Sequence, residues 1–148
     1  MVNINFYKLQ MVKEKAARYD INKNVSSPKE VYTALRTVFE LDILAEEHLV
    51  MFALDTKNKI VGAFDVAAGS LNSSIVHPRE VFKRALLNNA ASIIVAHNHP
   101  SGDPTPSSED INITSRLKEC GEILGVKLLD HIIVGDDSYS SLKEKGLL

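Results

Sequence analysis

The most informative stretch of the chain is Ser92-Ile93-Ile94-Val95-Ala96-His97-Asn98-His99-Pro100. Its small and apolar first part predicts a buried strand over residues 92–96, which ends where the histidines begin a loop. The loop continues as SGDPTPSS (residues 101–108), in which glycine and proline predict tight turns. Ser107 has the residue type and position to cap a helix that we expect to run to about Leu124. A buried strand, a turn-rich loop and a helix therefore follow one another here.

Patterns on both sides of this stretch predict further helices and strands. Ser27-Pro28-Lys29-Glu30 has the pattern of a capping box and begins a helix to about Glu40, and Pro78 begins another helix to about Asn88. Strands are expected at 48–55 and 60–66, paired as a hairpin, at 127–134 and at 139–140, with a short helical tail from Leu142. Residues 1–24 fit either an edge strand or a short amphipathic helix. This order of elements predicts a mixed α/β fold.

Composition and charge narrow the class of protein. A chain of 148 residues fits one domain that can bury its own core. The formal net charge of −2 gives no field that would attract phosphate backbones, so charge does not support nucleic-acid binding. The single cysteine, Cys120, excludes an internal disulfide and is expected to be a small buried hydrophobic residue. We expect a cytoplasmic protein without a membrane segment, because no signal-like N-terminus or long apolar run occurs.

His97 and His99 are candidate metal ligands. Residues two apart on extended backbone project to the same side, so both imidazoles can reach one ion. Catalytic zinc usually takes three protein ligands and keeps a fourth position open. Asp110 is the best third ligand, because the turn-rich loop would fold back and place the first turn of the following helix beside the histidines. Ser107 and Asp110 also match a helix capping motif, and the two interpretations are compatible.

Hydrolysis would also need a general acid/base, for which the sequence offers two glutamates. Glu47 precedes the first buried strand, and Glu80 lies in the first turn of the helix that begins at Pro78. The helix dipole explains Glu80 without any catalytic role. Glu47 has no such explanation, although it also fits a solvated residue at the end of a loop.

Taken together, these residues resemble a known signature. Glu47 before an apolar strand, His97-x-His99-Pro100 and Ser107-x-x-Asp110 resemble the JAMM motif of JAB/MPN-type zinc metalloproteases. The wider text is similar to the bacterial RadC family over roughly residues 26–148, and the segments that carry this similarity are HPREVF (77–82), AHNHPSGD (96–103) and LDHIIVG (129–135).

The resemblance implies a three-layer α/β/α JAB-like (cytidine deaminase-like) fold with a curved mixed sheet, over residues 26–148. Residues 1–25 would form an extension packed on or near this RadC-like JAB/MPN domain. One zinc ion would be held by His97, His99 and Asp110, with Glu47 as general acid/base and Ser107 as a donor to the oxyanion. The implied function is a zinc-dependent hydrolase that cleaves a peptide or isopeptide bond with metal-activated water, so a peptide or protein is the expected substrate.

Other functions remain open at the level of sequence. RadC proteins are named for DNA repair, so the alternative is a repair- or recombination-associated protein whose metal is structural or acts on nucleic acid. The helical region that longer RadC proteins often carry ahead of this domain is not found here, which weakens that alternative. A third hypothesis is a scaffold that keeps the ligands without turnover. His131, inside an apolar strand, is interpreted as a core histidine, with a supporting role behind a metal ligand as the other option.

Overall fold

The computed structural model describes residues 1–70 and 76–148. Eight helices and strands occur in these residues. In chain order they are α1 (Pro28–Phe39), β1 (His48–Leu54), β2 (Ile60–Ala68), α2 (Pro78–Leu87), β3 (Ser92–Asn98), α3 (Ser108–Leu124), β4 (Lys127–Val134) and β5 (Tyr139–Ser141).

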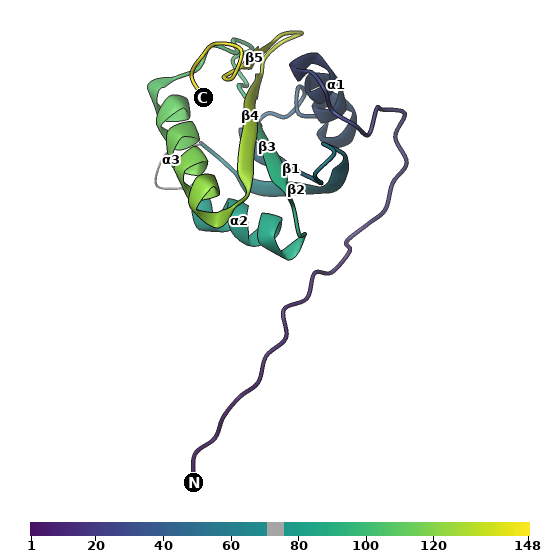
Figure 1. Cartoon of the computed structure of the whole chain (residues 1–148). Helices are drawn as coiled ribbons and strands as arrows, with labels where there is room; N and C mark the ends of the chain where they lie inside the picture. Colours follow the sequence, from purple (N-terminus) through teal and green to yellow (C-terminus); the bar gives the residue numbers. More distant parts are fainter. Residues whose placement is uncertain (71–75) are drawn as a thin grey trace.

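The strands form one mixed sheet in the order β2-β1-β3-β4-β5. β1 is antiparallel to both β2 and β3, β3 and β4 are parallel, and β5 returns antiparallel to β4. Helix α1 lies on one face of this sheet, and α2 and α3 cover the other (Figure 1). The expected three-layer α/β/α architecture is therefore confirmed.

Side-chain alternation along the central strands divides the core in two. On β1, Leu49 and Met51 face α2 and α3, whereas Val50 and Phe52 face α1. Because both faces of the sheet are covered, β1 and β3 are buried almost throughout, as is typical of sheets between helical layers. Each fully buried side chain of this size contributes about 1.5–3 kcal/mol of transfer free energy. The two apolar layers fix the register of β3, and hence the face on which each residue near its end projects.

Most of the predicted elements are confirmed. The capping box of α1 forms as expected, with Glu30 N donating to Ser27 Oγ and Ser27 N donating to Glu30 Oε2. Strand β3 extends two residues beyond the prediction, so His97 belongs to the strand itself. The helical tail from Leu142 is wrong: the C-terminal residues make turns, and Gly146 adopts a φ of 69°, which ends any helical path.

The N-terminal residues divide into two parts. Residues 1–20 are exposed and contain neither helix nor strand. The first of them run away from the domain in Figure 1, whereas residues 14–19 line a pocket together with the end of α1 and with β2. From Lys23 onward the chain lies against the hairpin, where Ile60 N donates to Lys23 O and Val25 N donates to Asn58 O. Val25 is buried in the core beside α1. Among the described residues, no helix is both long and apolar enough to span a membrane.

Candidate metal centre

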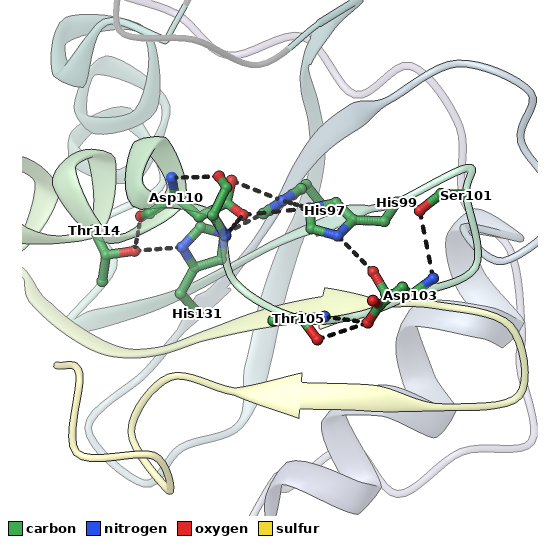
Figure 2. Close-up of polar contacts among 9 residues, drawn as sticks. His97, His99, Ser101, Asp103, Thr105, Asp110, Thr114 and His131 are labelled. Carbon is green, nitrogen blue, oxygen red and sulfur yellow. Dashed lines mark hydrogen bonds and ion pairs between the residues drawn. The ribbon is translucent and has the colours of Figure 1, made fainter.

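The two histidines and the aspartate predicted as ligands come together at the end of β3. His97 and His99 extend from this strand end, and Asp110 lies in the first turn of α3, which packs on the same face of the sheet (Figure 2). Nε2 of His97 is 3.1 Å from Oδ1 of Asp110, and Nε2 of His99 is 3.3 Å from its Oδ2. The two Nε2 atoms are 3.0 Å apart. The loop between the histidines and α3 folds back as the sequence predicted.

The tautomer of His99 is set by the loop that follows it. Its Nδ1 lies 2.8 Å from the carbonyl oxygen of Asp103. A carbonyl can only accept, so Nδ1 carries the hydrogen, and Nε2 of the neutral ring has a free lone pair. The loop is itself held in shape, since Oδ1 of Asp103 accepts from both the backbone N and the hydroxyl of Thr105 at 2.9 and 2.7 Å.

A buried chain of hydrogen bonds sets the tautomer of His97. The hydroxyl of Thr114 donates to the carbonyl of Asp110 at 2.6 Å and lies 2.6 Å from Nδ1 of His131. With its proton given to Asp110, this hydroxyl accepts from Nδ1 of His131, whose Nε2 then accepts from Nδ1 of His97 at 2.7 Å. Burial lowers the pKa of His131 well below its usual value, which keeps this ring neutral. Nε2 of His97 therefore also has a free lone pair.

Three electron-rich groups consequently face one another, with no hydrogen of their own to separate them. The lone pairs of His97 and His99 meet the carboxylate of Asp110 in a position where only a cation, either a proton or a metal ion, relieves the repulsion. Tetrahedral zinc with bonds near 2.0–2.1 Å separates its ligand atoms by about 3.3 Å. The observed separations of 3.0–3.3 Å match this arrangement. His97, His99 and Asp110 form a group that could hold a metal ion.

The pKa values of two ligands reflect this crowding. Burial alone would raise the pKa of Asp110, but its contacts with His97 and His99 outweigh burial and hold the pKa well below the ordinary range. The pKa of His99 is raised, first by its hydrogen bond to Asp110 and then by its bond to the Asp103 carbonyl, while the charges of Asp110 and Glu47 add least. A proton on His99 thus occupies the place that a metal cation would take, and the two compete.

Close backbone packing holds the loop between His99 and α3 against the end of β4. His99 N donates to Val134 O at 2.8 Å, and Asp136 N donates to Gly102 O at 2.8 Å. A Cβ at Gly135 would collide with the carbonyl oxygen of Gly102 and lie 2.8 Å from Cδ of Pro104. Glycine is therefore required at 135 for the loop to approach the strand this closely.

Ser107 is placed at the cap of α3, as predicted. Its Oγ accepts from Asp110 N at 3.1 Å, and its own N donates to Asp110 Oδ2 at 2.8 Å. The same carboxylate therefore closes the capping box and faces the histidines, so capping fixes where the ligand points. The hydroxyl hydrogen of Ser107 is not used by the cap.

The two candidate bases differ in their surroundings. Glu47 precedes β1, and its charge is felt by His99. Glu80 is bound to Lys83 at 2.6 Å and Arg84 at 3.0 Å, which hold its pKa low. Those two ion pairs and the helix terminus account for Glu80 without a catalytic role.

His131 and Thr114 lie behind the candidate ligands. His131 is 1% exposed, as the core interpretation expects, and its Nε2 also contacts Nδ1 of His97, so the two options that the sequence left open for His131 are compatible. The available signal was the polar pair Asp130-His131 inside an apolar strand. Thr114 gave no signal beyond its position four residues after Asp110, on the same face of the helix.

A three-layer α/β/α domain that brings His-x-His from a strand end against an aspartate in a helix cap defines a class of domains with one candidate metal site. The RadC-like JAB domain family matches residues 25–147, and the chain belongs to this family.

Similar proteins carry names without functional content. The chain is 55% identical to a UPF0758 protein of Clostridium beijerinckii over 134 residues, and this matched region covers 90% of this chain and 57% of that protein. Identity to a UPF0758 protein of Clostridium novyi is 53% over 146 residues, covering 95% and 63%. A UPF0758 protein of Clostridium acetobutylicum is 56% identical over 124 residues, covering 84% and 53%. The chain thus spans 53–63% of the length of these relatives.

Proposed function

We propose that this chain is a zinc-dependent hydrolase of JAMM type that cleaves a peptide or isopeptide bond. The observation that carries the proposal is the fixed tautomer of both histidines. Each donates its Nδ1 hydrogen to an acceptor and turns Nε2 toward Asp110. Two nitrogens and one carboxylate are the ligand set of a catalytic zinc site with an open fourth position.

The residues around the ligands supply the remaining chemistry in this proposal. A bound zinc ion would polarise the scissile carbonyl and make water nucleophilic near neutral pH. Glu47 takes the proton from the attacking water and returns it to the leaving amine. Ser107 uses its spare hydroxyl hydrogen to stabilise the negative charge that develops on the carbonyl oxygen. These two roles follow the family resemblance, and the charge effect of Glu47 on His99 supports the first.

A pocket beside His99 is the site where we expect a substrate to bind. It has a volume of about 350 Å³, and its lining includes Leu44, Ala45, His99, Pro100 and Gly135. Of the three candidate ligands only His99 lines this pocket, so a chain bound there would reach the metal centre past His99.

Metal analysis and peptide cleavage test the proposal together. Purified protein is expected to contain about one equivalent of zinc, and His97→Ala is expected to lose it. Cleavage of a quenched-fluorescence peptide library and of an ε-linked lysine isopeptide should require zinc and should fall in Glu47→Gln, with zinc content unchanged. Glu80→Gln is the matched control and should remain active.

Two outcomes would contradict the proposal. If folded wild-type protein does not bind zinc, the proposed metal centre is wrong. If zinc-loaded protein cleaves neither type of substrate, the proposed peptidase activity is wrong. Salt-sensitive binding of single-stranded DNA by that inactive protein would support the repair-associated alternative instead.

A further inference from the structure

Asn98 lies between the two histidine ligands but projects to the opposite side of β3. Along this strand, Val95 packs toward α2 and α3, whereas Ile94 and Ala96 pack toward α1. Side chains alternate along a strand, so His97 projects with Val95, and Asn98 projects with Ala96. Asn98 is 2% exposed, and an amide buried to this extent needs partners for its oxygen and its nitrogen.

The partners of Asn98 all belong to the segment that carries Glu47. Oδ1 of Asn98 accepts from His48 N at 2.8 Å, and Nδ2 donates to Glu46 O at 3.0 Å and to Leu44 O at 3.3 Å. The Glu46 carbonyl belongs to the peptide group before Glu47, and the His48 N–H belongs to the peptide group after it. One side chain therefore holds both peptide groups that flank Glu47.

Holding these two peptide groups sets the direction of the Glu47 side chain. Leu49 faces α2 and α3, and Glu47 directly precedes β1, so the alternation of β1 continued by one residue would place the Glu47 side chain on the face of the ligands. The Glu47 carbonyl is also occupied, since it accepts from Gly69 N at 2.9 Å.

We propose that Asn98 is a positioning residue: it joins the ligand strand to the segment of Glu47 and so holds the carboxylate at a set place relative to the metal centre. This inference rests on the proposed function for the role of Glu47. A side-chain amide supplies a donor and an acceptor in one plane, which matches a carbonyl and an N–H on either side of one residue. The His-Asn-His tripeptide thus provides two ligands on one face and aligns the base from the other.

The first test measures geometry and needs no turnover. The full chain is loaded with cobalt(II) alone, and the paramagnetic shifts of the Glu47 amide and carboxyl carbon are recorded. Asn98→Ala should change these shifts and speed hydrogen exchange at His48 N–H, because that amide loses its acceptor, while metal stoichiometry stays the same. Asn22→Ala is the matched control: its amide also joins loop groups, through Asn24 N and Glu30, but lies in an exposed segment at the other end of the hairpin.

Asn98→Asp gives a second variant of nearly the same shape. It keeps the acceptor for His48 N but places a carboxylate oxygen against the carbonyls of Leu44 and Glu46. We expect the same displacement of Glu47 in a variant that retains the volume of the native side chain. Unchanged Glu47 shifts in both Asn98 variants would overturn the proposal.

The second test couples Asn98 to Glu47 through activity. A displacement of a catalytic group by about 1 Å costs roughly a hundredfold, so Asn98→Ala should lower kcat by about 10–100-fold. In the Glu47→Gln background the same substitution should have little further effect. Equal losses in both backgrounds would show that Asn98 does not act through Glu47. If wild-type protein cleaves nothing, the proposed function fails, and the cobalt shifts still decide whether Asn98 positions Glu47.

Discussion

Replacement of His131 tests whether the buried hydrogen-bond chain supports the metal. His131→Phe keeps the ring volume but removes the acceptor for Nδ1 of His97 and the donor to Thr114, at contacts of 2.7 and 2.6 Å. His97 is 1% exposed, so no solvent replaces the lost acceptor. An unsatisfied buried donor costs about 1–3 kcal/mol, and loss of such an outer partner typically lowers metal affinity by about 10–100-fold. We therefore expect zinc affinity to fall by about 10–100-fold.

The assay for this prediction is competition for zinc against a chromophoric chelator, with the unfolding temperature of each variant measured in parallel. His131→Gln provides a partial rescue, because its amide oxygen can accept from His97 and its amide nitrogen can donate to Thr114. His77→Phe is the control at an exposed histidine. A folded His131→Phe protein with wild-type zinc affinity would show that the buried hydrogen-bond chain does not support the metal.

Four further predictions concern pH, packing and a helix cap. The pKa of His99 is raised by Asp110, so zinc affinity should fall about tenfold per pH unit below that pKa, measured by chelator competition. The stability of zinc-free protein should change with pH in the opposite direction to zinc affinity. The contribution of His99 to the free energy of unfolding is fully present below about pH 6.5, the pKa of an unfolded histidine, and is lost as pH rises through the folded pKa. Urea unfolding of the zinc-free protein measures this loss. Gly121→Ala should cost about 1–3 kcal/mol in urea unfolding, because its Cβ would collide with the carbonyl of Val126, and wild-type stability would contradict this packing. Ser107→Ala should lower the free energy of unfolding by about 1 kcal/mol, because the helix cap is lost, and should also lower turnover. Ser107→Thr should keep the cap. Equal stability of the two variants would contradict the capping role of Ser107.

The helices and strands that carry the site could be predicted from local signals. Both capping boxes and the proline at the start of α1 and α2 mark helix starts whose physics is local. The C-terminal tail could not be predicted in this way. Leu142 is fully buried and Leu147 N donates to its carbonyl, so tertiary packing keeps this segment in turns where local propensity allowed a helix.

The ligand set was predictable because its three members lie within 14 residues along one strand, loop and helix. The supporting residues depend on pairing that the sequence does not reveal. His131 reaches His97 only because β3 and β4 are parallel neighbours with Val95 opposite His131, which places the two rings diagonally on one face. Asn98 reaches its three partners only because the antiparallel β1–β3 pairing brings His48 beside the strand end.

These supporting contacts bear on whether the chain is only a scaffold that keeps metal ligands. A scaffold needs the ligands to be oriented, and the bonds to Asp103 and His131 already achieve that. It has no need for a buried amide that joins the ligand strand to the segment before β1, because hydrogen bonds of the sheet hold β1 and β3 together without it. A buried polar group of this kind adds little net stability and costs more when a partner is lost. Under the proposed function, Asn98 beside Glu47 would serve a reaction that needs a carboxylate at a set distance from the metal.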